Sequence, residues 1–249
     1  MLSRNALFAA ALTASAAFPV VASAASFAGN GGSGFGGDIG NGTLTITDDG
    51  TDINFALSGV VGGGNSLVLY LDTAPGGLVD TSLLSDTADG GRTSVSGFND
   101  NDALDPADDT RSLVTFAPGF ESDLAVVIAD FGLVVFETAA SPMDGDLPFV
   151  AFNGDGDFDV SIPLADLGVT AADSFDFVGT LVSNTAFRSD ETIGAATFTI
   201  PDPGTTPNPG FNGSVTFTES LTYDGSLVPE PASLGLLGLA GLGLMRRRK

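Results

Sequence analysis

The chain has 249 residues, of which 43% are apolar, and its 31 acidic and 8 basic residues give a formal net charge of −23. This length and apolar content predict a globular protein with a buried core and argue against a wholly disordered acidic polymer. Because cysteine and histidine are absent, a thiol nucleophile, a Ser-His-Asp triad, a disulfide framework and a conventional zinc site are excluded.

The first segment is typical of a secretory signal peptide. Arg4 lies near the start, an almost uninterrupted apolar run covers residues 6–21, and the small residues Ala22 and Ala24 follow. We therefore expect residues 1–24 to direct export and signal peptidase to cut after Ala24. A buried N-terminal helix is the alternative, but the run lacks the polar face that such a helix usually has.

The next residues, 25–42, are rich in glycine and predict a flexible lead-in. From residue 43 onward, short β-favouring runs alternate with Asp, Asn, Gly and Pro, and Leu67, Leu69 and Leu71 fall on one face of a strand. We expect about twelve strands, over residues 43–47, 52–60, 66–72, 92–96, 112–117, 124–129, 133–138, 149–152, 157–162, 174–182, 195–200 and 213–223.

These strands predict an all-β body over residues 43–227. An antiparallel two-sheet sandwich of jelly-roll type is the expected closure, because each strand must bury one apolar face against another layer. A barrel is the alternative. Between the signal helix and a short apolar helix at the C-terminus, only residues 106–111 and 163–167 suggest helical turns.

An acidic stretch begins near residue 99, where Asp100, Asp102, Asp105, Asp108 and Asp109 lie close together. Mutual repulsion favours either full solvation of these carboxylates or a bound cation. An ion pair between Arg111 and Asp108 or Asp109 is an equally good interpretation.

A second acidic motif gives the best local candidate for calcium. Asp155, Asp157 and Asp159 place carboxylates at every second residue, and Gly154 and Gly156 allow a tight loop around a hard cation. The spacing approaches that of an EF-hand, but valine occupies the position that requires glycine and the flanks predict strands. The alternative is an acidic hairpin turn whose aspartates bond to their own backbone.

Residues 160–168 (VSIPLADLG), which precede the acidic-aromatic stretch 173–177, carry a weaker signal. This pattern is similar to a strand and turn of family-nine carbohydrate-binding modules and DOMON-like sandwiches. The resemblance implies a β-sandwich and, as one function, binding to extracellular polysaccharide. Tryptophan is absent, so Tyr70, Tyr223 and the phenylalanines are the only rings on which a sugar could stack.

The C-terminal segment, residues 228–249, joins three features. Val228, Pro229, Glu230 and Pro231 precede a charge-free apolar run over residues 232–245, and the basic cluster Arg246, Arg247, Arg248 and Lys249 follows. The prolines keep the first part extended, and the positive-inside rule retains the basic cluster on the cytoplasmic side. A helix of 14 residues spans about 21 Å, which is short of the roughly 30 Å of a bilayer core, so we expect transient anchoring.

This order of features resembles the PEP-CTERM sorting segment of bacterial exported proteins. The resemblance implies that Pro229, Glu230 and Pro231 are recognised by an exosortase, which removes the tail and passes the protein to the cell surface or matrix. A simple C-terminal transmembrane anchor is the alternative. The resemblance describes only these last residues and leaves the function of the body open.

The net charge of the body limits the partners that it can bind. Residues 25–231 retain all 31 acidic residues but only Arg92, Arg111 and Arg188, a net charge of −28 that repels nucleic acid and anionic lipid. We expect a non-catalytic, calcium-stabilised exported protein of the cell surface or extracellular matrix. The alternatives are a polysaccharide-binding module and a carboxylate-pair glycosidase, for which Glu121 and Glu137 are the first acids to test.

Overall fold

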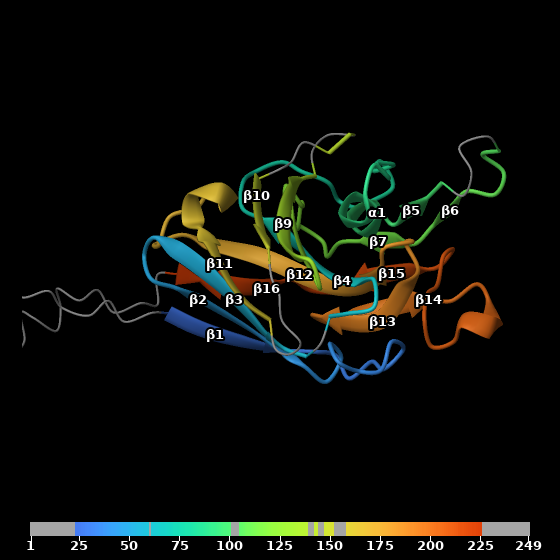
Figure 1. Cartoon of the computed structure of the whole chain (residues 1–249), viewed down its shortest axis with the longest axis horizontal. Coiled ribbons are helices and arrows are strands. Elements are labelled where there is room, and N and C mark those ends of the chain that lie inside the picture. The colour runs from blue at the N-terminus through green and yellow to red at the C-terminus, as the bar shows by residue number, and fades with distance from the viewer. Residues whose placement is uncertain are drawn as a thin grey trace, which may run out of the picture. The chain divides into compact units, whose positions relative to one another are not determined.

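The computed structural model describes residues 23–59, 61–100, 105–138, 142–143, 147–151 and 158–225. They belong to one compact unit, Ala22–Val228, built mainly from antiparallel strands (Figure 1). The all-β sandwich predicted from the sequence is confirmed. No helix within the described residues is long and apolar enough to cross a membrane, and the apolar run at 232–245 lies outside them.

The outer sheet has four antiparallel strands in the order β1-β2-β3-β11. Buried and less buried residues alternate along its inner strands, as the alternating sequence predicts, so the sheet buries one face. Its strands are β1 (Ser23–Ala28), β2 (Thr43–Asp48), β3 (Asp52–Ser58) and β11 (Phe158–Pro163).

The middle sheet follows the order β10-β9-β8-β4-β12-β13, and a short strand, β16, also pairs with β12. All of its pairings are antiparallel. Its strands are β4 (Asn65–Asp72), β8 (Leu124–Ala129), β9 (Gly132–Glu137), β10 (Leu147–Ala151), β12 (Ser174–Ser183), β13 (Arg188–Ile193) and β16 (Leu221–Asp224).

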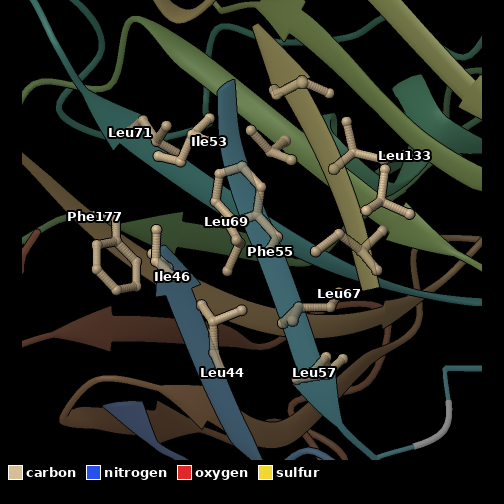
Figure 2. Close-up of a cluster of buried hydrophobic side chains, with 14 of the residues drawn as sticks. Leu44, Ile46, Ile53, Phe55, Leu57, Leu67, Leu69, Leu71, Leu133 and Phe177 are labelled. Carbon is tan, nitrogen blue, oxygen red and sulfur yellow. The ribbon is translucent and has the colours of Figure 1, made fainter. Parts of the chain in front are cut away.

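The main core lies between these two sheets. Figure 2 shows apolar side chains of β2 and β3 pointing toward those of the middle sheet, and all of them are buried. The labelled side chains are Leu44, Ile46, Ile53, Phe55, Leu57, Leu67, Leu69, Leu71, Leu133 and Phe177. Leu67, Leu69 and Leu71 share one face of β4, as their spacing predicts.

A third layer covers the other face of the middle sheet. It consists of helix α1 (Gly90–Ser96) and a three-stranded sheet in the order β14-β15-β7, in which β15 and β7 run parallel. Its strands are β7 (Leu113–Thr115), β14 (Ala196–Thr199) and β15 (Ser214–Phe217). Figure 1 shows α1 and β7 on the side of the middle sheet opposite to β1 and β2. A second core of buried apolar side chains fills this interface.

This third layer corrects the expectation of two sheets. Every residue of β8 is buried, and β4 is buried on both faces along its central six residues. A strand buried on both faces needs a continuous apolar run, and the LAVVIA sequence of β8 is such a run. The continuous apolar run of β8 therefore indicated burial on both faces. The expectation of two sheets assumed instead that each strand has one apolar face.

Residues 92–96, expected as a strand, are part of α1. Asp89 caps the helix, since its Oδ1 accepts a hydrogen bond of 2.9 Å from the Arg92 N–H, and Gly97 ends it in the left-handed conformation with φ of 63°. Aspartate before the first turn and glycine after the last are the usual start and stop signals of a helix. These capping residues outweigh the β-favouring Thr93 and Val95 between them.

Other boundaries also differ from the prediction. Residues 213–223 form β15 and β16 instead of one strand, whereas β1 and β13 were not expected. A single helical turn is confirmed at Leu164–Leu167. The remaining short elements are β5 (Phe98–Asn99), β6 (Thr110–Arg111) and a helical turn at Pro203–Thr205.

The glycine-rich segment 25–42 is folded against the body instead of forming a flexible lead-in. Its first residues are in β1, and its loop encloses the fully buried carboxylate of Glu191 on β13. That carboxylate accepts four backbone hydrogen bonds of 2.7–3.1 Å, from Phe35, Gly37, Ile39 and Gly40. Several N–H donors that converge on one buried anion replace its lost hydration, so the glycines fix a loop here.

The second core also buries a cation. Arg188 is fully buried, and its guanidinium donates to Ser112 and to the Thr180 hydroxyl at 3.3–3.4 Å. Burial lowers the pKa of Arg188, while nearby Tyr70 partly offsets this effect. The layer that covers this face is therefore held by polar contacts as well as by apolar packing.

Candidate functional site

Three turns and the start of α1 enclose a cavity at one end of the middle sheet. Ser66 on β4 pairs with Ala129 on β8, and Ala129 pairs with Gly132 on β9, so the β8–β9 turn lies beside the start of β4. Asn65 pairs with Ser183, which brings the turn after β12 to the same end. We call this cavity the hairpin pocket.

The hairpin pocket has a volume of about 480 Å³. This is within the range of roughly 300–1,000 Å³ that is usual for small-molecule sites. It is lined by Gly64, Asn65, Ser66, Asp89, Gly90, Gly91, Arg92, Asp130, Phe131, Val134, Phe136 and Asn184.

Glycines make room for this pocket. A Cβ atom at Gly90 would lie 3.1 Å from the Cβ of Asn184, and one at Gly91 would lie 3.2 Å from the Phe136 ring. Both separations are tighter than ordinary van der Waals contact, so a side chain at either position would crowd the wall of the pocket. The apolar part of the lining is formed by the buried side chains of Val134 and Phe136.

Arg92, the cation of the hairpin pocket, is already committed. Its guanidinium forms ion pairs with Asp89 and, at 3.3 Å, with Asp86, and it lies 4.9 Å from the centre of the Phe136 ring. Two aspartates therefore surround this cation, and Asp130 adds a further carboxylate to the lining. The local charge favours a neutral or cationic ligand over an anion.

Three other polar side chains of the hairpin pocket are not committed to the fold. Asn65, Asp130 and Asn184 make no side-chain hydrogen bond with any residue that the structure describes, and Asp130 and Asn184 are exposed. An asparagine amide both donates and accepts hydrogen bonds, while a carboxylate accepts them. These groups are available to a ligand that carries hydroxyls.

Phe131 stands at the tip of the two-residue β8–β9 turn and is 42% exposed. Neither Asp130 nor Phe131 is among the residues with positive φ, so the backbone of this turn does not require Asn, Asp or Gly at its tip. The exposed ring of Phe131 lies beside the uncommitted polar groups of the hairpin pocket.

The predicted calcium motif is only partly described. Asp159 lies in β11 with an exposed side chain, and its Oδ1 accepts a hydrogen bond of 2.6 Å from the Asn54 amide. Asp155 and Asp157 lie outside the described residues. Among the residues that are described, no group of three acidic side chains is arranged to hold a metal ion. Calcium stays a prediction.

Arg111 is used differently from the predicted ion pair with Asp108 or Asp109. Its guanidinium donates to the carbonyl oxygens of Thr81, at 3.0 Å, and Leu84, at 2.5 Å, and stacks 4.8 Å from the centre of the Phe98 ring. Burial lowers its pKa, and Asp80 partly offsets this effect. Arg111 therefore fixes the loop before α1.

Tyr70, one of the rings expected to be able to stack on a sugar, is not accessible. It is fully buried, and its hydroxyl donates a hydrogen bond of 2.7 Å to the Val95 carbonyl in α1. Tyr223 is also buried. Glu121 and Glu137 are exposed, but neither lines the hairpin pocket.

A group of acids that the sequence analysis missed lies at the opposite end of the middle sheet. Asp123 accepts two hydrogen bonds from Thr73, at 2.8 and 2.6 Å. Asp176 accepts two from the hydroxyls of Ser220 and Thr222, at 2.9 and 2.6 Å. Asp72 accepts one of 3.0 Å from the Glu121 N–H. We call Asp72, Asp123 and Asp176 the acidic end.

Repulsion within the acidic end is visible at Asp72. Burial raises the pKa of Asp72, the Glu121 N–H lowers it, and the nearby charges of Asp123, Asp176 and Glu121 raise it further. Asp72 and Asp176 face each other across β4 and β12. Distant positions in the sequence meet here through sheet pairing, which local spacing does not reveal.

The predicted processing residues fall largely outside the described part of the chain. Ala22, the sorting residues Val228, Pro229, Glu230 and Pro231, and the basic cluster Arg246, Arg247, Arg248 and Lys249 all lie there. Ala24 is described: it lies in β1 and pairs with Thr47 of β2. The proposed cut after Ala24 would shorten β1 and leave Ala25–Ala28 paired.

A scan against protein families matches residues 227–249 to the PEP-CTERM protein-sorting motif. The chain carries a PEP-CTERM motif. This confirms the resemblance seen in the tail and supports an exported protein that is sorted by an exosortase. No curated protein and no solved structure matches the chain, so the resemblance of the body to DOMON-like sandwiches stays a prediction.

Proposed function

We propose that this chain is a non-catalytic protein of the cell surface or extracellular matrix, cut by an exosortase at its Pro-Glu-Pro motif after export. The observation that carries the proposal is the PEP-CTERM match over residues 227–249. The apolar run anchors the chain in the membrane only transiently, because about 21 Å of helix is too short to span a bilayer core without strain.

The non-catalytic role is supported by the chemistry of the body. Histidine and cysteine are absent from the sequence, so hydrolysis would depend on paired carboxylates. The carboxylates of the acidic end accept hydrogen bonds from neighbouring residues, and Glu121 and Glu137 lie outside the hairpin pocket. A binding or structural role fits these residues better than a glycosidase does.

The sorting step is tested by comparing two variants in the native host. Glu230→Ala changes the motif, whereas Glu219→Ala removes an exposed acid of the body and serves as the matched control. We expect Glu230→Ala to accumulate in the membrane fraction with its basic tail intact, and Glu219→Ala to reach the surface like the wild type. Equal processing of both variants would refute recognition of the motif.

We also propose that calcium binds the loop of Asp155, Asp157 and Asp159. The alternating aspartates and their glycines support this proposal. A ligand that binds only the folded state raises the melting temperature, so calcium should raise it above the value measured with a chelator. The double variant Asp155→Asn/Asp157→Asn should abolish that difference. Equal melting curves of the wild type in calcium and chelator would show that the aspartates are solvated turn residues.

A further inference from the structure

We propose that the hairpin pocket binds a neutral glycosyl unit of an extracellular polysaccharide. Phe131, a large apolar side chain, is 42% exposed at the tip of the β8–β9 hairpin. Pyranose rings have an apolar face of C–H bonds, and the negative face of an aromatic ring attracts such groups. Phe131 offers this surface at the rim of the pocket.

The polar lining complements the other part of a sugar. Hydroxyl groups both donate and accept hydrogen bonds, and Asn65, Asn184 and Asp130 supply donors and acceptors that no described residue uses. Two of the three lie at turn tips, beside the exposed ring. The lining thus joins an apolar platform to uncommitted amide and carboxylate groups within one cavity of about 480 Å³.

The charge of the pocket lining favours a neutral sugar over an anionic one. Arg92 is paired with Asp86 and Asp89, so it has little positive charge to offer a sulfate or uronate. Asp130 is a further negative charge in the lining, and residues 25–231 carry a net charge of −28. Desolvating an anionic sugar beside these carboxylates is unfavourable, whereas a neutral sugar meets no such barrier.

The absence of side chains at Gly90 and Gly91 keeps the pocket open. An added Cβ atom would approach Asn184 or the Phe136 ring within 3.1–3.2 Å, at the wall where the ligand would lie. Both glycines have ordinary backbone angles, since neither is among the residues with positive φ. Space in the pocket is therefore a better reason for these glycines than backbone conformation.

The test measures retention of the full chain, purified without a sugar-based detergent, on immobilised neutral polysaccharides. The panel contains dextran, mannan, galactan and xylan, with alginate as the anionic comparison. We expect at least one neutral polymer to be retained more strongly than alginate. Retention by none of the neutral polymers, or stronger binding to alginate, would overturn the proposal.

Variants then locate the site by titration with an oligosaccharide of the retained polymer. Phe131→Ala should weaken binding about tenfold, and Phe131→Tyr, which keeps the ring, should stay within about twofold of the wild type. Leu83→Ala trims a side chain that is 74% exposed and lies outside the pocket, so it should leave the affinity unchanged. Asn184→Ala tests the polar lining independently and should also weaken binding.

Unchanged affinity in both Phe131→Ala and Asn184→Ala would place the sugar elsewhere and overturn the assignment. Melting curves of each variant separate lost binding from lost folding. The proposal depends on the proposed export only for its source of polysaccharide, because the purified chain is tested directly. Failure to bind sugar would therefore leave the sorting proposal standing, and failure of sorting would leave the binding measurement valid.

Discussion

The two ends of the middle sheet use polar residues in opposite ways. At the acidic end, Asp123 and Asp176 each accept two hydrogen bonds of 2.6–2.9 Å from residues of the fold. At the hairpin pocket, Asn65, Asp130 and Asn184 make no side-chain hydrogen bond to a described residue. Side chains that hydrogen-bond to the fold stabilise it, whereas side chains without such bonds in a cavity are available to a ligand. Variants at the acidic end should therefore change stability, and variants at the hairpin pocket should change binding.

The largest loss of stability is expected at the acidic end, from Asp123→Ala. This change leaves the Thr73 N–H and hydroxyl without their acceptor, and because the site is half-buried we expect a loss of about 1–2 kcal/mol in the free energy of unfolding. Urea denaturation measures it. A loss below about 0.3 kcal/mol would contradict this expectation, because the side chains of the acidic end would then stabilise the fold no more than those of the hairpin pocket do.

A smaller loss is expected from Asp89→Ala, which changes a residue of the hairpin pocket that does stabilise the fold. Asp89 is the N-cap of α1, and its removal should cost about 1 kcal/mol in the free energy of unfolding. Asp89→Asn retains a good cap and should cost only a few tenths of that amount. If both variants lose the same stability, the ion pair with Arg92 is the contribution that matters, and the cap is not.

The uncommitted side chains should affect stability least among the truncations. Asp130→Ala and Asn184→Ala remove exposed groups that make no side-chain hydrogen bond to a described residue, so the free energy of unfolding should stay within about 0.5 kcal/mol of the wild type. The same denaturation experiment measures both. A loss above about 1 kcal/mol in the free energy of unfolding would show that these side chains stabilise the fold and are not available to a ligand.

The smallest effect concerns pH and Asp72. Burial raises the pKa of Asp72 above its ordinary value of 3.8, so the folded chain holds this proton more tightly than the unfolded chain. Asp72 therefore contributes fully to the stability of the folded chain below pH 3.8. This contribution is lost as the pH rises through the higher pKa that Asp72 has in the folded chain. Asp72→Asn should therefore gain stability relative to the wild type from pH 3 to 6, by at most about 0.5 kcal/mol after solvent screening. A relative loss over this range would contradict the direction of the shift.

Alternating sequence predicted the outer sheet well, because each of its inner strands has one buried face. The third layer was missed since β8 was treated like those strands, although its six consecutive apolar residues are all buried. Helix α1 was missed for another reason: Thr93 and Val95 favour strands, and the capping residues Asp89 and Gly97 were not weighed against them. The order of the strands in each sheet could not be read from local patterns, since β4 pairs with β12 more than a hundred residues away.

The site was less predictable than the fold. The sequence offers Tyr70 and Tyr223 as rings for a sugar, and the burial of both excludes them. Phe131 could have been found by noticing a large apolar residue in a two-residue turn, between the strands at 124–129 and 133–138 that the sequence did predict. The meeting of Asn65, Asp130 and Asn184 had no such local signal, because it depends on the pairing of β4 with both β8 and β12.

Removal of the tail after export is tested most directly by intact-mass measurement of the protein recovered outside the host cell. We predict a chain that begins at Ala25 and lacks both the apolar run at 232–245 and the final cluster Arg246–Lys249. Recovery of extracellular protein that retains those arginines would contradict sorting at the Pro-Glu-Pro motif. Confinement of the uncut chain to the cytosol would contradict export itself.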